Sequence, residues 1–332
     1  MNNSDIQLNV LRDGVQPFEV EIDPTNICNQ NCYFCNVEEF RKTCKDAATT
    51  EDYIKLIKSL PDTVGKIVFS GGGDPIVHPN ISDMVEEACK KDAEVGFITN
   101  GTLLQRLKIT KELHPTWIGI DVDTVDSDSY FTIRESKIDY VMKNIDNVVP
   151  QIQSCGTLVT FKALITHYNN TWEKLEEAIK FAKDKGFDEF FVRVAHFKDG
   201  RVIEPITTWD DVEQRLRAYA KKVGIKFMCA FEKEKIFRGN GGCVEKCFGP
   251  KKAVIFCADG YTYWCTEFRG VPEYRLGSWI EDGYDSIFKK GLLDEMEQFG
   301  EYHKCDVQCK YSHLVNEDGS WDMNKCLENG DI

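Results

Sequence analysis

The residues best suited to chemistry are three cysteines in one short loop. Cys28, Cys32 and Cys35 stand within residues 23–35 at the spacing Cys-x3-Cys-x2-Cys. Three thiolates at this spacing can hold three irons of a cubane 4Fe-4S cluster, and no further cysteine occurs until Cys44, so one iron would stay open. A zinc knuckle or a ferredoxin-type cluster is the alternative, and either would need a fourth ligand at short spacing.

A second group of cysteines occupies the C-terminal third of the chain. Its members are Cys229, Cys243, Cys247, Cys257, Cys265, Cys305, Cys309 and Cys326. Two β-prone runs, residues 254–256 and 261–263, flank Asp259-Gly260, which predicts a β-hairpin within this group. The sequence shows no secretory signal, so we expect fourteen cysteines to serve metal ligation in a reducing compartment and not disulfides. Cys44, Cys89 and Cys155 stand apart and are expected to be packing residues or loop thiols.

Length and composition limit the classes of protein to which this chain can belong. A length of 332 residues predicts two folded units. The net charge of −14 argues against a nucleic-acid partner, because such binding rests on clustered lysines and arginines. No stretch is apolar over the ~20 residues that a membrane span requires, so we expect a soluble, cytoplasmic protein with no membrane partner.

These cysteines must be positioned by a repeat of strands and helices. Predicted strands cover residues 18–23, 66–70, 95–99, 117–122, 158–166 and 189–195. Predicted helices cover residues 51–60 (capped by Thr50), 81–91, 103–112, 138–152, 171–185 and 209–223. The fold class is therefore α/β: a partial (β/α)6 parallel barrel over residues 1–224, followed by a small cysteine-rich domain, a β-hairpin plus a helix, over residues 225–332. Ligands of such sheets bind at the carboxyl ends of the strands, where the first cysteine loop would lie.

The alternation of side chains along the strands places charged groups inside the barrel. Glu21, Asp121, Lys162 and Arg193 fall at inward positions of four different strands, and Glu19, Asp23 and Asp123 accompany them. These groups either contact a polar substrate or cofactor, which makes the first four the candidate catalytic residues, or pair with one another to satisfy buried charge.

The cysteine loop, with Tyr33 and Phe34 before its last cysteine, resembles that of radical S-adenosylmethionine (SAM) enzymes. In that family the amino and carboxylate groups of SAM chelate the open iron, and one electron cleaves SAM to a 5'-deoxyadenosyl radical. The turn at residues 70–75 is similar to the family's Gly-Gly-Glu-Pro stretch, with Asp74 where Glu is usual. The resemblance implies that Gly72, Gly73 and Asp74 bind SAM.

Three later segments extend the resemblance. Asn100 lies in a Thr-Asn-Gly turn like that of the family, which implies a further cofactor-binding residue. Gly119 replaces a serine whose hydroxyl family members offer to SAM, so the ligand set at this strand is incomplete. Arg134 closes a Tyr-x-x-Ile-Arg stretch, and it pairs either with the SAM carboxylate or with a surface acid.

The C-terminal cysteines resemble the SPASM and Twitch auxiliary-cluster domains. The spacing from Cys247 to Cys265, with Gly260 between them, opens such domains, and Cys305-x3-Cys309 supplies two more thiolates. The resemblance implies one auxiliary 4Fe-4S cluster of the shorter Twitch type, because residues 290–304 lack the cysteines of a full SPASM domain. Cys243 or Cys326 is an alternative to Cys305, and structural zinc is an alternative to the cluster.

The resemblance implies a radical SAM oxidoreductase, or a related radical-based modifying enzyme, with SAM and two 4Fe-4S clusters as cofactors. The expected substrate is polar, either a sugar or aminocyclitol-type metabolite or a ribosomal peptide, and an electron donor such as flavodoxin or ferredoxin would be a partner. Epimerisation, crosslinking or excision of a ribosomal peptide is the alternative reaction. The other class of function is a non-catalytic iron-sulfur or zinc protein, which would need neither an open iron nor a glycine turn beside it.

Overall fold

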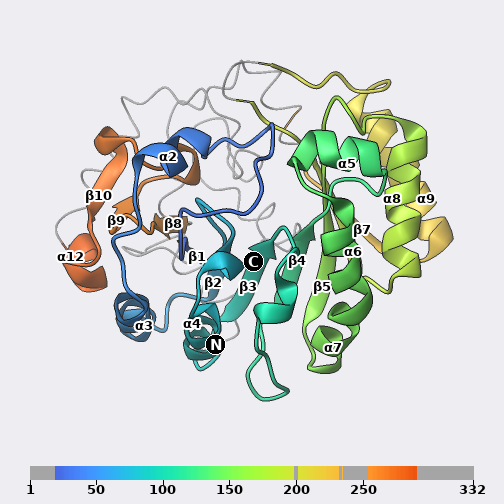
Figure 1. The fold of residues 1–332 in the computed structure, drawn as a ribbon. Helices are drawn as coiled ribbons and strands as arrows, with labels where there is room; N and C mark the ends of the chain where they lie inside the picture. Colours follow the sequence, from blue (N-terminus) through green and yellow to red (C-terminus); the bar gives the residue numbers. More distant parts are fainter. Residues whose placement is uncertain (1–18, 198–200, 232–233, 235–252, 290–332) are drawn as a thin grey trace.

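The computed structural model of the protein describes residues 19–197, 201–231, 234 and 253–289. All six predicted strands are confirmed, and each pairs in parallel with the next. They are β1 (Glu19–Ile22), β2 (Lys66–Phe69), β3 (Glu94–Thr99), β4 (Trp117–Asp121), β5 (Leu158–Ile165) and β6 (Glu189–Val194). The α/β class with a parallel sheet is therefore the observed architecture (Figure 1).

The sheet continues on both sides of these six strands. A seventh strand, β7 (Lys226–Cys229), pairs in parallel with β6 and begins just after Gly224, where the repeat was expected to stop. On the other side, β8 (Ala253–Phe256) pairs in parallel with β1 and forms the predicted hairpin with β9 (Tyr261–Tyr263). An antiparallel strand, β10 (Arg275–Ser278), completes the order β10-β9-β8-β1-β2-β3-β4-β5-β6-β7. One sheet therefore carries strands from both sides of the predicted boundary at residue 224.

Four helices follow the predicted pattern. They are α3 (Thr50–Ser59), α4 (Ile81–Ala88), α8 (Trp172–Asp184) and α9 (Trp209–Val223), and a threonine side chain caps three of them, all but α4. The predicted cap of α3 is wrong by one position, because the Thr49 side chain accepts from the backbone of Asp52 and the Asp52 carboxylate accepts in return. Gly224 ends α9 at φ +80°, a conformation that glycine adopts without strain.

Two helix predictions need correction. The segment 138–152 forms two helices, α6 (Ile138–Asn147) and α7 (Val149–Ser154), because Pro150 has no N–H and is tolerated only in the first turn of a new helix. The segment 103–112 forms only the short 3-10 helix η2 (Leu104–Arg106). The leucines of this segment are spaced as in an α-helix. A single turn is nevertheless enough to bury Leu104 and Leu107, and no side chain caps that turn.

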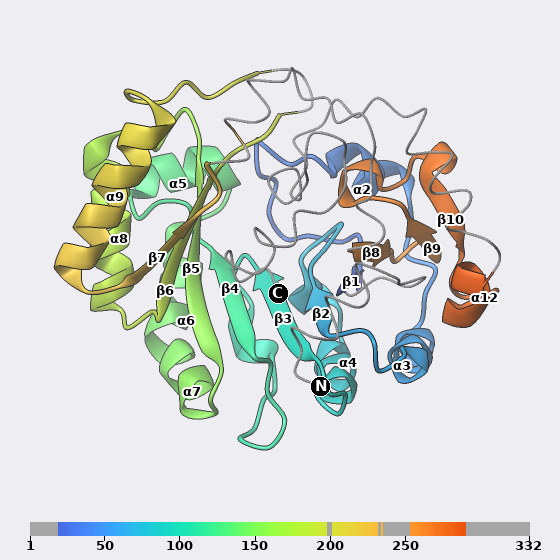
Figure 2. The same ribbon diagram turned by 180° about the vertical axis from the view of Figure 1, so that it is seen from behind.

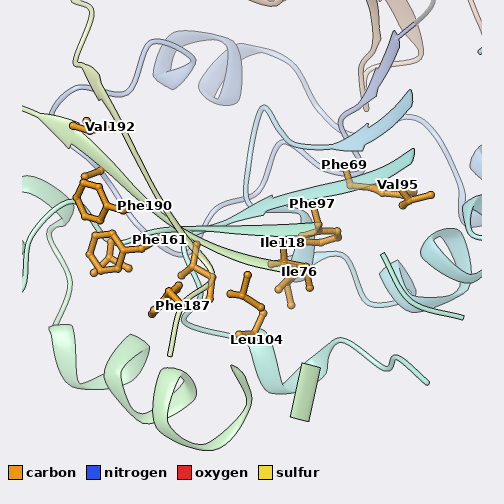
Figure 3. Close-up of a cluster of buried hydrophobic side chains, with 14 of the residues drawn as sticks. Phe69, Ile76, Val95, Phe97, Leu104, Ile118, Phe161, Phe187, Phe190 and Val192 are labelled. Carbon is orange, nitrogen blue, oxygen red and sulfur yellow. The ribbon is translucent and has the colours of Figure 1, made fainter. Parts of the chain in front are cut away.

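The core lies between the sheet and its helices. Phe161 of β5 stacks on Phe190 of β6 and meets Phe181 of α8, which confirms that this side of the strands faces the helices (Figure 3). The opposite side of each strand, which carries the charged residues, is therefore the interior of the partial barrel. No helix within the described ranges is long and apolar enough to cross a membrane.

Two short helices that the sequence pattern missed lie close to the predicted site. They are α2 (Glu38–Thr43), directly after the cysteine loop, and α5 (Ser127–Arg134), after β4. Both lie along the upper edge of the molecule in Figures 1 and 2, whereas α7, α8 and α9 flank the strands. The last described helix, α12 (Gly283–Lys289), begins the predicted helical segment near Tyr284, and its continuation lies outside the described residues.

Candidate active site

The first cysteine loop is held by the glycine turn that follows β2. The backbone N–H of Gly73 donates to the Thr25 carbonyl over 2.9 Å, and that of Asp74 donates to the Ile27 carbonyl over 3.0 Å. A Cβ atom on Gly73 would lie 2.0 Å from the Ile27 carbonyl oxygen, and one on Gly72 would lie 2.4 Å from the Asn26 Oδ1 atom. Gly73 is therefore required by the close approach of two backbones, whereas Gly72 leaves room for the Asn26 side chain.

The Asp74 carboxylate joins this turn to the next one. It is buried and accepts from the Thr99 hydroxyl, from the Asn100 backbone N–H over 2.7 Å, and from the Ile76 backbone N–H over 3.0 Å. Burial raises the pKa of Asp74, while these donors act in the opposite direction. Asp74 thus fixes the turns after β2 and β3 relative to each other, and its predicted contact with SAM stays a prediction.

Each of the three cysteine sulfurs accepts one N–H donor from a different element. The Asn100 amide lies 3.9 Å from Cys28 Sγ, and Arg134 Nη1 of α5 lies 3.6 Å from Cys32 Sγ. Arg41 Nη1 of α2 lies 3.7 Å from the sulfur of the third cysteine, Cys35. The sequence analysis missed Arg41, whose only signal is a cationic residue shortly after the last cysteine of the motif.

The protonation of these thiols depends on their burial. Burial raises the pKa of Cys28, and it raises the pKa of Cys32 to about 12, although the charge of Arg134 acts against it. Three thiols of one loop, each with its own N–H donor, are a fitting ligand set for an iron-sulfur cluster.

Arg134 is held by a buried acid, not by a surface one. Its Nε donates to Asp123 Oδ2 over 2.7 Å, and both side chains are almost fully buried. Asp123 sits at φ +68°, a left-handed conformation in which Asp is tolerated better than most residues. The Nη2 atom of Arg134 is buried and has no hydrogen-bond partner among the residues described. That donor is available to a bound anion.

On the β1 side of the barrel interior, the acids are already paired. Arg269, from the segment after β9, donates to Asp23 over 2.7 Å and lies 3.6 Å from Glu21. The Ser70 hydroxyl also donates to Glu21 over 3.1 Å. The sequence analysis did not single out Arg269, because nothing local shows that a C-terminal arginine reaches β1. The catalytic role predicted for Glu21 stays a prediction.

On the β4–β6 side, the structure brings two of the predicted residues together. Asp121 of β4 and Lys162 of β5 are register partners, and Lys162 Nζ lies 5.6 Å from the ring centroid of Phe191. Gly119 leaves room for the lysine stem, because a Cβ there would lie 2.4 Å from Lys162 Cδ. Arg193 shares this inward side on β6 and is exposed.

The C-terminal cysteine group is described only in part. Cys257 is fully buried just after β8, and its thiol contacts Asp23. Cys265 is half-buried directly after the hairpin, where it precedes the 3-10 helix η3 (Thr266–Phe268). The other predicted auxiliary ligands, Cys247, Cys305 and Cys309, lie outside the described residues, as do the alternatives Cys243 and Cys326.

Comparisons with known proteins agree with this arrangement. A family model described as the radical SAM superfamily matches residues 22–218. The antilisterial bacteriocin subtilosin biosynthesis protein AlbA of Bacillus subtilis (strain 168) is 25% identical over 293 residues, which is 85% of this chain and 62% of AlbA. The chain thus spans less than two thirds of the length of this curated relative.

Solved structures share the fold. Streptococcus suis SuiB bound to S-adenosylmethionine superposes with a TM-score of 0.65 at 17% identity, over 86% of this chain and 68% of that one. SuiB bound to its precursor peptide SuiA gives a TM-score of 0.64 at 15% identity, over 94% of this chain and 71% of that one. At these identities the likeness concerns the fold alone.

Proposed function

The chain belongs to the radical SAM superfamily, and from this premise we propose that Cys28, Cys32 and Cys35 hold the 4Fe-4S cluster of a radical-forming enzyme. Enzymes of this family use such a cluster together with SAM. When bound and reduced by an external electron donor, the cluster would supply the one electron that cleaves SAM into methionine and a 5'-deoxyadenosyl radical. The observation that carries the assignment is that each of the three sulfurs of this loop has its own N–H donor, beside a glycine turn.

The chain's own groups orient SAM. The turn at Gly72 and Gly73 brings backbone beside the cysteine loop, and Asn100 lies against the Cys28 sulfur. The buried Nη2 of Arg134 offers a donor to the SAM carboxylate, while the Nε of the same side chain is held by Asp123. A charged donor held in place before the ligand arrives costs no reorganisation on binding.

We propose a ribosomal peptide as the substrate. The match to AlbA, named for bacteriocin biosynthesis, covers 85% of this chain, and SuiB, which shares the fold, was solved with a precursor peptide. Asp121, Lys162 and Arg193 would contact polar groups of the substrate inside the barrel. A sugar or aminocyclitol alcohol is the competing substrate and requires the same polar side chains.

We also propose that Cys265, with Cys247, Cys305 and Cys309, holds one auxiliary 4Fe-4S cluster that assists substrate oxidation. Cys265 directly follows the β8–β9 hairpin, and β8 pairs with β1, the strand that leads into the first cysteine loop. The hairpin therefore connects the two cysteine groups through neighbouring strands. An external donor such as flavodoxin or ferredoxin would supply electrons.

Anaerobic reconstitution with iron and sulfide tests the assignment of the first cluster. The parent protein is expected to form 5'-deoxyadenosine from SAM under a strong reductant. Changing Cys28, Cys32 and Cys35 together to Ala is expected to remove one cluster's iron and abolish this product. Cys155→Ala, at the end of α7, is the matched control and is expected to behave as the parent. Retained 5'-deoxyadenosine in the triple variant would refute the assignment.

Substrate and reaction are tested together by mass spectrometry. A peptide encoded beside the gene is expected to lose two hydrogens per turnover, with one SAM consumed for each product. Turnover of a polyol but not of any such peptide would refute the peptide proposal. SAM regenerated without net oxidation would instead indicate epimerisation or rearrangement, and the oxidative role of the auxiliary cluster would then fail.

A further inference from the structure

The donors to the three cysteine sulfurs are not alike in charge. Asn100 is neutral, whereas Arg41 and Arg134 carry full positive charges that point at Cys35 and Cys32, respectively. Charge-assisted hydrogen bonds are about twice as strong as neutral ones. The net charge near an iron-sulfur cluster and the hydrogen bonds to its sulfurs are two of the quantities that set its reduction potential.

We infer that Arg41 and Arg134 tune the reduction potential of the SAM-binding cluster, with Arg41 raising it most and Asp123 offsetting Arg134. This inference rests on the proposed assignment of the cluster to Cys28, Cys32 and Cys35. Reduction adds one negative charge to the cluster, and a nearby guanidinium stabilises the reduced form more than the oxidised form. Both arginines are positioning residues, because they act through the cysteine sulfurs.

Arg41 is held in the loop by two of its nitrogen atoms, and the third is buried. Its Nη1 reaches Cys35 Sγ, its Nη2 lies 3.5 Å from the Gln30 carbonyl oxygen, and its Nε is buried without a hydrogen-bond partner in the described part of the chain. The guanidinium thus spans the loop from Gln30 to Cys35. No acid pairs with it among the described residues, so its full charge acts on the sulfurs.

The environment of Arg134 differs from that of Arg41 because a buried carboxylate lies next to it. The carboxylate of Asp123 lies 2.7 Å from its Nε, and the two side chains are buried together. Because Arg134 reaches the Cys32 sulfur and Asp123 pairs with Arg134, the two opposite charges act on that sulfur in opposite directions. Removing the negative charge alone should therefore strengthen the effect of the arginine.

These opposite signs define the experiment. The reduction potential is measured by an anaerobic titration that follows the electron paramagnetic resonance (EPR) signal changed by SAM, which identifies the first cluster. Arg41→Gln is expected to make reduction about tenfold less favourable, which is ~59 mV for a one-electron couple. Asp123→Asn keeps a residue that tolerates the left-handed conformation and is expected to shift the potential in the opposite direction.

Lys42→Gln is the matched control. Lys42 neighbours Arg41 in α2 and carries the same charge, but its side chain is 62% exposed and pairs with Glu38. Its loss is expected to leave the potential unchanged, because exposed charges are screened by solvent. Arg41→Lys keeps the charge without the planar fork and is expected to retain most of the parental potential.

Three results would overturn the inference. One is a parental potential in Arg41→Gln with a full cluster, and another is an equal shift in Lys42→Gln. If Arg41→Gln fails to load iron, Asp123→Asn decides alone, and an unchanged or lowered potential there overturns the inference. A parent protein that loads no SAM-responsive cluster would overturn the proposed function itself, and that failure is distinct from a loaded cluster whose potential does not move.

Discussion

Both sides of the barrel interior carry charged side chains, but these side chains are buried to different degrees. On the β1 side, Glu21 and Asp23 are buried and held by Arg269, a residue from more than two hundred positions further along the chain. On the β4–β6 side, Asp121 and Lys162 are half-buried and Arg193 is exposed. Charge inside a barrel therefore does not by itself indicate a substrate site.

The difference assigns separate roles to the two sides. Arg269 neutralises acids that would otherwise be costly to bury, and it joins the hairpin segment to the first strand. The charged side chains on the β4–β6 side are more exposed than those on the β1 side. We therefore place the substrate contacts at β4–β6 and expect changes on the β1 side to affect stability first.

The largest expected effect is the loss of Arg269. Arg269→Met would leave Asp23 and Glu21 buried without their cation, at a cost of about 3–5 kcal/mol of folding free energy. Thermal and chemical unfolding measure the loss, with Arg215→Met as the control. Arg215 pairs with Glu176 at the surface, where such pairs contribute about 0–1 kcal/mol. Equal stability of the two variants would contradict the claim that Arg269 stabilises the fold on the β1 side.

The second prediction concerns Lys162 on the β4–β6 side. Lys162→Met keeps the stem that fills the space above Gly119 and removes only the charge. Product formation is expected to fall on the order of 100-fold because the substrate is no longer oriented, while uncoupled 5'-deoxyadenosine formation and the melting temperature stay near parental values. A large loss of stability with little change in turnover would mean that Lys162, like Arg269, mainly stabilises the fold.

A smaller effect is expected at Gly119. Gly119→Ala places a Cβ 2.4 Å from Lys162 Cδ, so the flexible lysine must shift. Displacing it is expected to lower product formation roughly tenfold, in line with overpacking costs of about 1–3 kcal/mol. The effect should disappear when Gly119→Ala is added to Lys162→Met, because coupled sites are not additive. Additive losses would show that Gly119 acts by another route.

The smallest effect is expected outside the barrel interior, at the start of α5. The Asp126 side chain accepts from the Ser129 N–H over 3.0 Å, and these hydrogen bonds lower its pKa. Asp126→Ala should cost about 1 kcal/mol, whereas Asp126→Asn keeps a cap. A lowered pKa means that the stabilisation is present above the ordinary Asp pKa of about 3.9 and is lost as pH falls through the folded value. Stability measured against pH in both variants checks this, and an Ala variant with the parental pH profile would contradict it.

Local patterns predicted much of the fold. The six strands follow from β-branched and aromatic runs, and the hairpin from Asp259-Gly260 between two such runs. Errors arose where a local rule was overlooked, as with Pro150, or where helices were too short to show a period, as with α2 and α5. Spacing singled out the cysteines as candidate ligands, but Arg41 and Arg269 act through contacts that only the folded chain defines.

The central claim is that Cys28, Cys32 and Cys35 hold a cluster with one iron open to SAM. The most direct test uses a variant in which Cys247, Cys265, Cys305 and Cys309 are changed to Ala, so that only the first cluster remains. Reconstituted and reduced without air, it is expected to bind about four irons and to show an EPR spectrum that changes when SAM is added. A cluster whose spectrum ignores SAM, or zinc in place of iron, would contradict the claim.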